Sequence, residues 1–141
     1  MGSLAGRGAH AVLYIDLDHF KAINDTWGHD TGDQLLRTAT RRLRQASGNP
    51  DLLFRVGGDE FVVLIKTKDS TQAQNIASLI LEQICKPMGI ENSSISLSAS
   101  IGISMSGKGK KLGPDLIKEA DLAMYHAKQT GGNQVVMSEN M

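Results

Sequence analysis

Short apolar runs divide this chain into segments that have the character of β-strands. In most of these runs the apolar residues follow one another almost without interruption, and in one they alternate strictly with serine and glycine. A continuous run is typical of a strand buried on both faces, whereas alternation is typical of a strand with one buried and one polar face. The predicted strands cover residues 11–15, 52–56, 61–65, 95–103 and 134–137.

Apolar residues spaced three or four positions apart fill the intervals between these runs and indicate amphipathic helices. The helical segments cover residues 19–27, 31–43, 70–84 and 114–127. Thr31 and Gln34 match a capping box, so we expect the second helix to begin there. The order of the elements predicts an α+β fold: a ferredoxin-like sheet of about five strands, with flanking helices packed mainly on one face.

The composition describes a single domain without a strong charge of either sign. The chain has 141 residues, 40% of them hydrophobic, and its 15 Lys and Arg balance 15 Asp and Glu. This balance argues against a nucleic-acid or anionic-membrane partner, and no apolar run approaches the ~20 residues of a membrane span. We therefore expect one cytoplasmic domain over residues 11–141, with any membrane anchor outside it. The Gly-rich stretch 1–10 is interpreted as a flexible lead-in and in part a cloning remnant.

A group of arginines stands out on the second helical segment. Arg37, Arg41, Arg42 and Arg44 lie mostly opposite its apolar stripe. Because the net charge of the chain is zero, we interpret these arginines as a solvated helix face rather than as a nucleic-acid patch.

The link between the predicted strands 52–56 and 61–65 is short and carries two acids. Gly57-Gly58 tolerates positive φ at both central positions of a tight hairpin turn, and Asp59 and Glu60 follow at once. The glycines leave the turn open to a large ligand, and the adjacent carboxylates could bind a metal together with its phosphates. A plain hairpin with a solvated acidic turn explains the same residues, and the motif alone leaves both interpretations open.

Two further acids, Asp16 and Asp18, follow the strand predicted at 11–15. Their spacing places both on one face of the sheet, at the edge where α/β proteins bind ligands. Asp16 still belongs to the strand and is the stronger candidate ligand, whereas Asp18 is well placed to cap the next helix. The free N–H groups at the start of that helix would offer a phosphate site beside a metal.

Three separated blocks of sequence carry a family resemblance. They are IDLDHFKAIND at 15–25 with GHD at 28–30 and GD at 32–33, RVGGDEF at 55–61, and ADLAMYHAK at 120–128. Together they resemble the GGDEF domain, the catalytic unit of diguanylate cyclases, over about residues 11 to 137. The resemblance implies the nucleotide-cyclase palm type of the ferredoxin-like sheet, with Gly57-Gly58-Asp59-Glu60 on a β-hairpin.

The resemblance implies a reaction between two nucleotides. Two GTP molecules condense to cyclic di-GMP and two pyrophosphates, the 3′-hydroxyl of each GTP attacking the α-phosphate of the other. Each domain holds one GTP, so the implied partner is a second copy of the chain in a transient or activated homodimer. Mg²⁺ or Mn²⁺ is the implied cofactor, and fused signalling domains are expected in the full-length protein.

The resemblance also implies which residues hold the metal. Asp16 and Asp59 would bind it, with the Leu17 carbonyl nearby, and Glu60 would support the site. Asp59 and Glu60 are the implied catalytic residues. These assignments agree with the chemistry of Mg²⁺, which is typically held by one or two protein carboxylates and by the phosphates of its substrate.

The implied GTP site draws on the segments after the first strand and on the last helix. Asn24 and Asp33 would hydrogen-bond the guanine edge, which presents both donors and an acceptor. His29 would lie near that pocket, although a packing or capping role suits it equally. For Asp33, the favourable interaction of a negative charge with the helix dipole is a sufficient alternative explanation. Lys21 and Lys128 would bind phosphate through their side chains. The backbone N–H groups of His19, Phe20 and Lys21 would also contact phosphate, and Gly57 and Gly58 would leave the turn open to the nucleotide.

The sequence departs from the family pattern at three places. Gly132 stands where the family has a phosphate-contacting arginine, which should weaken GTP binding or transition-state stabilisation. Gly48 stands where the family's product-inhibition site has its arginine, beside a retained Asp51, so we predict no ordinary inhibition by cyclic di-GMP at that degenerate site. The family's first helix is absent, so we expect a domain truncated there, with impaired dimerisation.

Three functions compete on this sequence. We favour an active cyclase, because Asp16, Asn24, Asp33 and the motif at 57–61 are intact. The alternative is a catalytically weak or inactive GTP-binding regulatory module that controls an attached domain, such as a cyclic di-GMP phosphodiesterase; Gly132 and the degenerate inhibitory site favour it. A fold relative that binds no nucleotide is disfavoured, because packing gives no reason to retain a metal set and a guanine set together.

Overall fold

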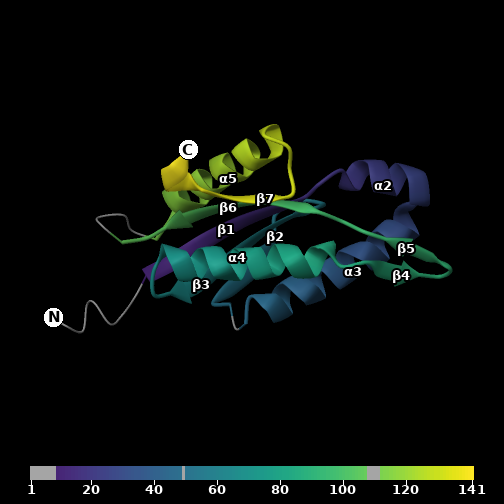
Figure 1. Cartoon of the computed structure of the whole chain (residues 1–141), viewed down its shortest axis with the longest axis horizontal. Coiled ribbons are helices and arrows are strands. Elements are labelled where there is room, and N and C mark those ends of the chain that lie inside the picture. The colour runs from purple at the N-terminus through teal and green to yellow at the C-terminus, as the bar shows by residue number, and fades with distance from the viewer. Residues whose placement is uncertain (1–8, 49, 108–111) are drawn as a thin grey trace.

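A five-stranded mixed sheet forms the centre of the computed structural model, which describes residues 9–48, 50–107 and 112–141 (Figure 1). The strand order is β2-β3-β1-β6-β7. The central β1 is antiparallel to both of its neighbours, β2 is antiparallel to β3, and β7 joins β6 in parallel. The strands are β1 (Ala9–Leu17), β2 (Leu52–Arg55), β3 (Glu60–Thr67), β6 (Ala99–Met105) and β7 (Gln134–Met137). The predicted α+β fold is confirmed.

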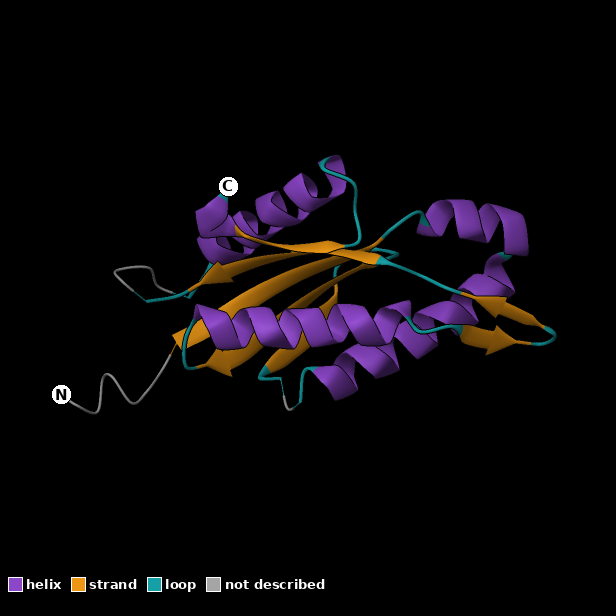
Figure 2. Cartoon of the chain, in the orientation of Figure 1, coloured by secondary structure: helices purple, strands orange, loops and turns teal. Residues whose placement is uncertain are grey.

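Helices cover both faces of this sheet, which corrects the expectation that they pack mainly on one (Figure 2). They are α2 (Phe20–Trp27), α3 (His29–Ala46), α4 (Ser70–Cys85) and α5 (Pro114–Gln129). The larger core joins α3 and α4 to Leu13 and Ile15, and a smaller core joins α5 to Val12 and Tyr14. Because β1 is apolar at both alternating sets of positions, both of its faces need a cover. Among the described residues, no helix is long and apolar enough to cross a membrane.

The first strand begins earlier than the apolar pattern indicated. Residues 1–8 of the predicted lead-in lie outside the described residues, whereas Ala9 and His10 pair with Thr67 and Lys66 of β3. The pattern missed this start because the apolar run that predicted the strand begins only at Ala11.

The alternating segment predicted as one strand over 95–103 forms two. Its first part belongs to β5 (Ser93–Ile95), which pairs with β4 (Met88–Ile90) in a separate hairpin. β6 begins at Ala99, opposite Leu17, the last residue of β1. Because β1 ends there, the segment before Ala99 leaves the sheet: Ser93–Ile95 pair with β4, and residues 96–98 belong to neither strand. The carbonyl of Ser98 still accepts a hydrogen bond from the N–H of Asp18 at 2.9 Å.

The small residues of β6 pack beneath α5 and do not form the polar outer face that the alternation suggested. Ser100 and Ser104 are fully buried. A Cβ added to Gly102 would overlap the backbone of Ala120 in α5. Ser104 satisfies its buried hydroxyl by donating to the carbonyl of Leu116 at 2.6 Å. Small side chains therefore let the helix lie close against the sheet.

The start of α3 is also corrected. The helix begins at His29, with Gly28 as its N-cap and no side-chain capping bond, so Thr31 lies within the first turn instead of capping it. Gly28 has a φ of 92°, a conformation that glycine adopts readily. Its N–H donates to the carbonyl of Asn24 at 2.8 Å, closing α2. One glycine thus joins two helices, and no capping box is needed.

Candidate active site

Three carboxylates meet where β1 ends and β3 begins. Asp16 lies opposite Glu60 in the register of the sheet, and the N–H of Leu17 donates to the carbonyl of Asp59 at 3.1 Å. One oxygen of each of Asp16, Asp59 and Glu60 lies within 4.8 Å of the others. We call these three residues the acid cluster. The structure thus brings the predicted metal-binding acids together, as ligands that suit a hard divalent cation.

The acid cluster carries more negative charge than its surroundings neutralise. Burial raises the pKa of Asp16 to about 7, with Asp59 and Glu60 acting in the same direction and Lys128 opposing them. Burial and the neighbouring Glu60 also raise the pKa of Asp59. A cation bound between these carboxylates would favour their charged forms. The cluster could therefore hold a metal ion.

The Gly-Gly turn is wider than predicted and does not use left-handed backbone. Arg55 and Phe61 form the last strand pair, and the N–H of Val56 donates to the carbonyl of Glu60 at 2.8 Å. Neither Gly57 nor Gly58 has a positive φ, and a Cβ on either would meet nothing within 4 Å. The fold itself therefore does not demand glycine at these positions. Their bare backbone leaves space beside the acid cluster.

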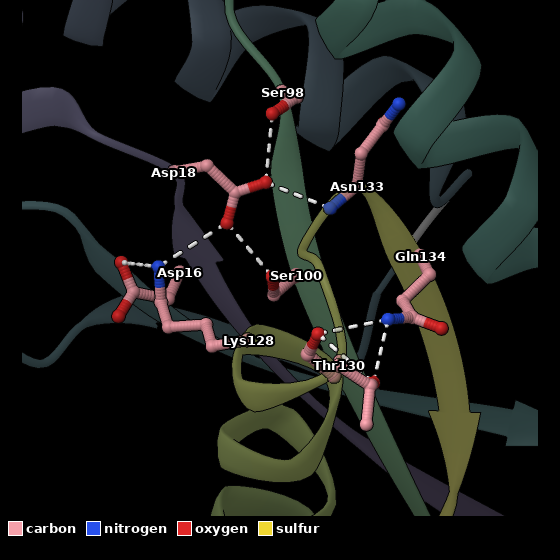
Figure 3. A network of polar contacts seen from close by, with 9 residues as sticks. Asp16, Asp18, Ser98, Ser100, Lys128, Thr130, Asn133 and Gln134 are labelled. Carbon is pink, nitrogen blue, oxygen red and sulfur yellow. Dashed lines mark hydrogen bonds and ion pairs between the residues drawn. The ribbon is translucent and has the colours of Figure 1, made fainter.

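Asp18 is a buried anchor and does not cap α2, which corrects that assignment (Figure 3). Its Oδ1 accepts hydrogen bonds from Ser100 Oγ at 2.7 Å and Lys128 Nζ at 3.2 Å. Its Oδ2 accepts from Ser98 Oγ at 2.7 Å and from the N–H of Asn133 at 2.8 Å. Burial alone would raise the pKa of Asp18, but these hydrogen bonds outweigh it and lower the pKa. We call these five residues the Asp18 network.

Lys128 links the Asp18 network to the acid cluster. Its ammonium lies 3.2 Å from Asp18 Oδ1 and 3.5 Å from Asp16 Oδ1, in the last turn of α5. The predicted phosphate-binding lysine is therefore beside the predicted metal ligands. Gly132, where the family pattern has arginine, has a φ of 72°, and a Cβ there would lie 3.0 Å from Asp18 Oδ2. The departure from the family pattern thus lies directly against the network.

The side chain of Asn24 presents an unused acceptor. Its Oδ1 is buried and has no hydrogen-bond partner among the described residues. A Cβ on Gly32 of α3 would overlap this oxygen, so glycine at that position makes room for it. A buried acceptor without a donor is costly. Asn24 is therefore the residue of the predicted guanine set that most needs a ligand donor.

The other predicted nucleotide-binding residues lie at the start of α2 and of α3. Phe20 is buried, so only its backbone could serve a ligand, while Lys21 is exposed. His19 precedes α2 in a left-handed conformation, with a φ of 56°. His29 is the first residue of α3, and Asp33 follows one turn later; both are exposed. Their roles toward GTP stay predictions.

The two residues of the degenerate inhibitory site flank the connection from α3 to β2. Gly48 is exposed, and Oδ2 of Asp51 lies 3.2 Å from Nε2 of His10 in β1. The carboxylate that the family would offer to a product is thus engaged within the fold. The predicted lack of product inhibition stays a prediction.

Sequence reasoning missed one residue that contacts the acid cluster. Tyr14 lies in the apolar run of β1 and was assigned only to the strand, but its hydroxyl donates to Glu60 Oε1 at 2.9 Å. Burial and the Glu60 carboxylate raise the pKa of Tyr14. The available signal was its spacing, since a residue two positions before Asp16 points to the same face of the strand.

Comparison with known proteins gives the same assignment. The family model described as "Diguanylate cyclase, GGDEF domain" matches residues 4–134. The chain is 35% identical to the GGDEF domain of TpbB (YfiN) from Pseudomonas aeruginosa, with a TM-score of 0.87, covering 96% of this chain and 86% of that one. It is 26% identical to the active GGEEF domain of a diguanylate cyclase from Vibrio cholerae, with a TM-score of 0.85, covering 97% of this chain and 87% of that one.

Two curated relatives are much longer proteins. The chain is 42% identical over 123 residues to the bifunctional diguanylate cyclase/cyclic di-GMP phosphodiesterase MucR of P. aeruginosa, covering 87% of this chain and 18% of that protein. It is 35% identical over 130 residues to the cyclic di-GMP phosphodiesterase NbdA of the same organism, covering 92% of this chain and 16% of that protein. The chain thus spans less than a fifth of the length of these multidomain relatives.

The mixed sheet with an acid cluster at its Gly-Gly hairpin defines a signalling domain of the GGDEF type. The chain belongs to the GGDEF diguanylate cyclase domain family. Its relatives include proteins named as diguanylate cyclases and others named as phosphodiesterases.

Proposed function

We propose that this domain is a diguanylate cyclase, which condenses two GTP into cyclic di-GMP and two pyrophosphates across a homodimer. The observation that carries the proposal is the acid cluster, placed beside a bare turn and beside Lys128. In each half-reaction a 3′-oxygen bonds to the α-phosphorus of the other GTP and loses its proton, while the bond to the β-phosphate oxygen breaks. Two such steps close the ring and release two pyrophosphates.

Each group in the site has a task in this proposal. The acid cluster would hold Mg²⁺ or Mn²⁺, which neutralises phosphate charge and lowers the pKa of the attacking hydroxyl. Lys128 would bind phosphate oxygens, for which it must exchange its contacts with Asp16 and Asp18. Asn24 Oδ1 would accept an N–H of guanine, which gives the buried oxygen its missing partner. Asp33 would accept from a second N–H donor of the same edge.

A regulatory GTP-binding module is the second candidate. Gly132 supplies no cation to the phosphates, which supports binding without efficient turnover. The naming of relatives such as NbdA as phosphodiesterases also supports it, because a GGDEF domain there forms part of a protein with a different activity. In this case an attached domain in a longer protein would respond to GTP bound at the same residues.

Product formation separates the two candidates. Purified protein is incubated with GTP and Mg²⁺ and the nucleotides are separated by chromatography, beside Asp59→Asn and a control, Asp115→Asn, in the exposed first turn of α5. Cyclic di-GMP from the parent and the control, but not from Asp59→Asn, supports the cyclase. If the parent binds GTP without forming cyclic di-GMP, and Asn24→Ala abolishes that binding, the result supports the regulatory module. If the parent neither binds GTP nor forms cyclic di-GMP, both candidate functions are overturned.

A further inference from the structure

A groove of 610 Å³ runs along α3 toward β2 and is lined by four arginines. Arg37, Arg41 and Arg44 come from α3 and Arg55 from β2, with Asp33 at one end. The three helix arginines are spaced four and three residues apart, so they share one face over about 10 Å of the helix axis. The acid cluster does not line this groove. Four positive charges thus meet on one groove of a chain whose 15 basic and 15 acidic residues balance as a whole.

Nothing in the fold uses these four guanidinium groups. Within the described ranges, none of them makes an ion pair or a hydrogen bond with another residue, and all four side chains are exposed. Arg42 on the same helix is different, because its guanidinium donates to the carbonyls of Lys86 at 2.6 Å and Pro87 at 3.0 Å. Like charges at these spacings repel one another along a helix. The groove arginines are therefore not explained by the stability of α3.

We propose that this groove is a second anion site, which binds a compact ligand carrying two or more phosphoryl groups. Guanidinium groups bind phosphate oxygens through paired, charge-assisted hydrogen bonds, and several on one wall suit adjacent phosphates. The volume lies within the range of small-molecule pockets, about 300–1,000 Å³, and Asp33 bounds the positive charge at one end. Both observations favour a nucleotide-sized anion over a long polyanion. Anion binding in this groove would not require catalysis at the acid cluster.

Phosphate binding without metal tests the site. Pyrophosphate is titrated into the protein in EDTA by calorimetry, which leaves the acid cluster without a cation. We expect Arg41→Gln/Arg44→Gln to weaken binding about tenfold or more, as loss of charge-assisted hydrogen bonds predicts. The matched control, Lys66→Gln/Lys68→Gln, removes two exposed charges at the far end of β3 and should leave the affinity unchanged. Thermal melts of both variants check that they fold.

The outcomes are separate from those of the proposed function. Asp59→Asn should retain pyrophosphate binding in EDTA whether or not the parent makes cyclic di-GMP. Equal affinity in the two double variants, or no binding to the parent, overturns the second site. Tighter, arginine-dependent binding of an RNA oligonucleotide than of pyrophosphate overturns the compact ligand. If GTP in EDTA competes with pyrophosphate for the groove, nucleoside polyphosphates are the source of the phosphates. If GTP does not compete, the ligand is free pyrophosphate.

Discussion

Asp16 and Asp18 stand two residues apart in one segment, yet their surroundings are opposite. The carboxylate of Asp18 receives four donors, and its pKa is lowered. Asp16 shares its space with two other carboxylates, and its pKa is raised to about 7. The first environment is complete without a ligand, whereas the second gains by binding a cation. The comparison separates a residue that maintains the architecture from residues that serve a ligand.

The largest expected effect tests the structural half of this comparison. Asp18→Ala removes the acceptor of four donors, two of them from buried or half-buried serines and one from Lys128. Loss of a buried charged partner typically costs about 3–5 kcal/mol, and we expect a loss of that size in the free energy of unfolding. Urea denaturation measures it. A loss below about 1 kcal/mol would contradict the assignment of Asp18 as an anchor.

Tyr14→Phe tests how much the hydrogen bond from the core strand to the acid cluster stabilises the fold. The substitution keeps the buried ring and removes the hydrogen bond to Glu60. We expect a loss of about 1 kcal/mol in unfolding free energy. Tyr125→Phe on the exposed surface of α5 is the control and should change stability by less than about 0.5 kcal/mol. If both variants have the same stability, the hydrogen bond from Tyr14 to Glu60 does not stabilise the fold.

Asp59→Asn tests the ligand-binding half. Removing one charge from a crowded cluster should leave stability in EDTA within about 1 kcal/mol of the parent, or raise it. Mg²⁺ should raise the melting temperature of the parent by mass action, and this increase should be lost in the variant. Differential scanning calorimetry with and without Mg²⁺ measures both effects. An equal Mg²⁺-dependent shift in parent and variant would place the metal elsewhere.

Gly57→Ala has the smallest expected effect on stability. The φ at this position is not positive and a Cβ has room, so the free energy of unfolding should change by less than about 0.5 kcal/mol. GTP affinity should nevertheless fall, because the methyl group occupies space beside the acid cluster. Chemical denaturation and GTP titration distinguish these effects. Unchanged affinity would show that the nucleotide does not approach this turn.

Local patterns singled out individual residues, whereas their meeting in space had to come from other evidence. Asp16 was a candidate because it ends an apolar run, and Asp59 and Glu60 because they follow a Gly-Gly pair, but only the family resemblance joined these two distant segments into one metal site. The role of Asp18 was not predictable, since Ser98, Ser100, Lys128 and Asn133 lie 80 to 115 residues further along the chain. A local pattern therefore favoured a helix cap, which needs only the next few residues.

The layers of the fold show the same limit. The alternation of apolar residues with serine and glycine in β6 indicated a strand, but it could not show that α5 covers the small side chains. The capping box at Thr31 matched a local rule and predicted that the helix begins there. In the structure Gly28 is the N-cap, and the helix begins at His29. Periodicity thus predicted most of the elements, whereas tertiary packing decided their ends and faces.

The hydrogen bond from the N–H of Asn133 to Asp18 has a consequence for the time at which the site matures. A ribosome adds about 5–20 residues per second, so Asp18 is made roughly 6 to 23 seconds before the residue 115 positions later that completes its set of donors. Until β7 joins β6, Asp18 lacks the donor from Asn133. A growing chain that has only its earlier strands would thus carry the GGDEF motif without the finished surroundings of its metal-binding residues.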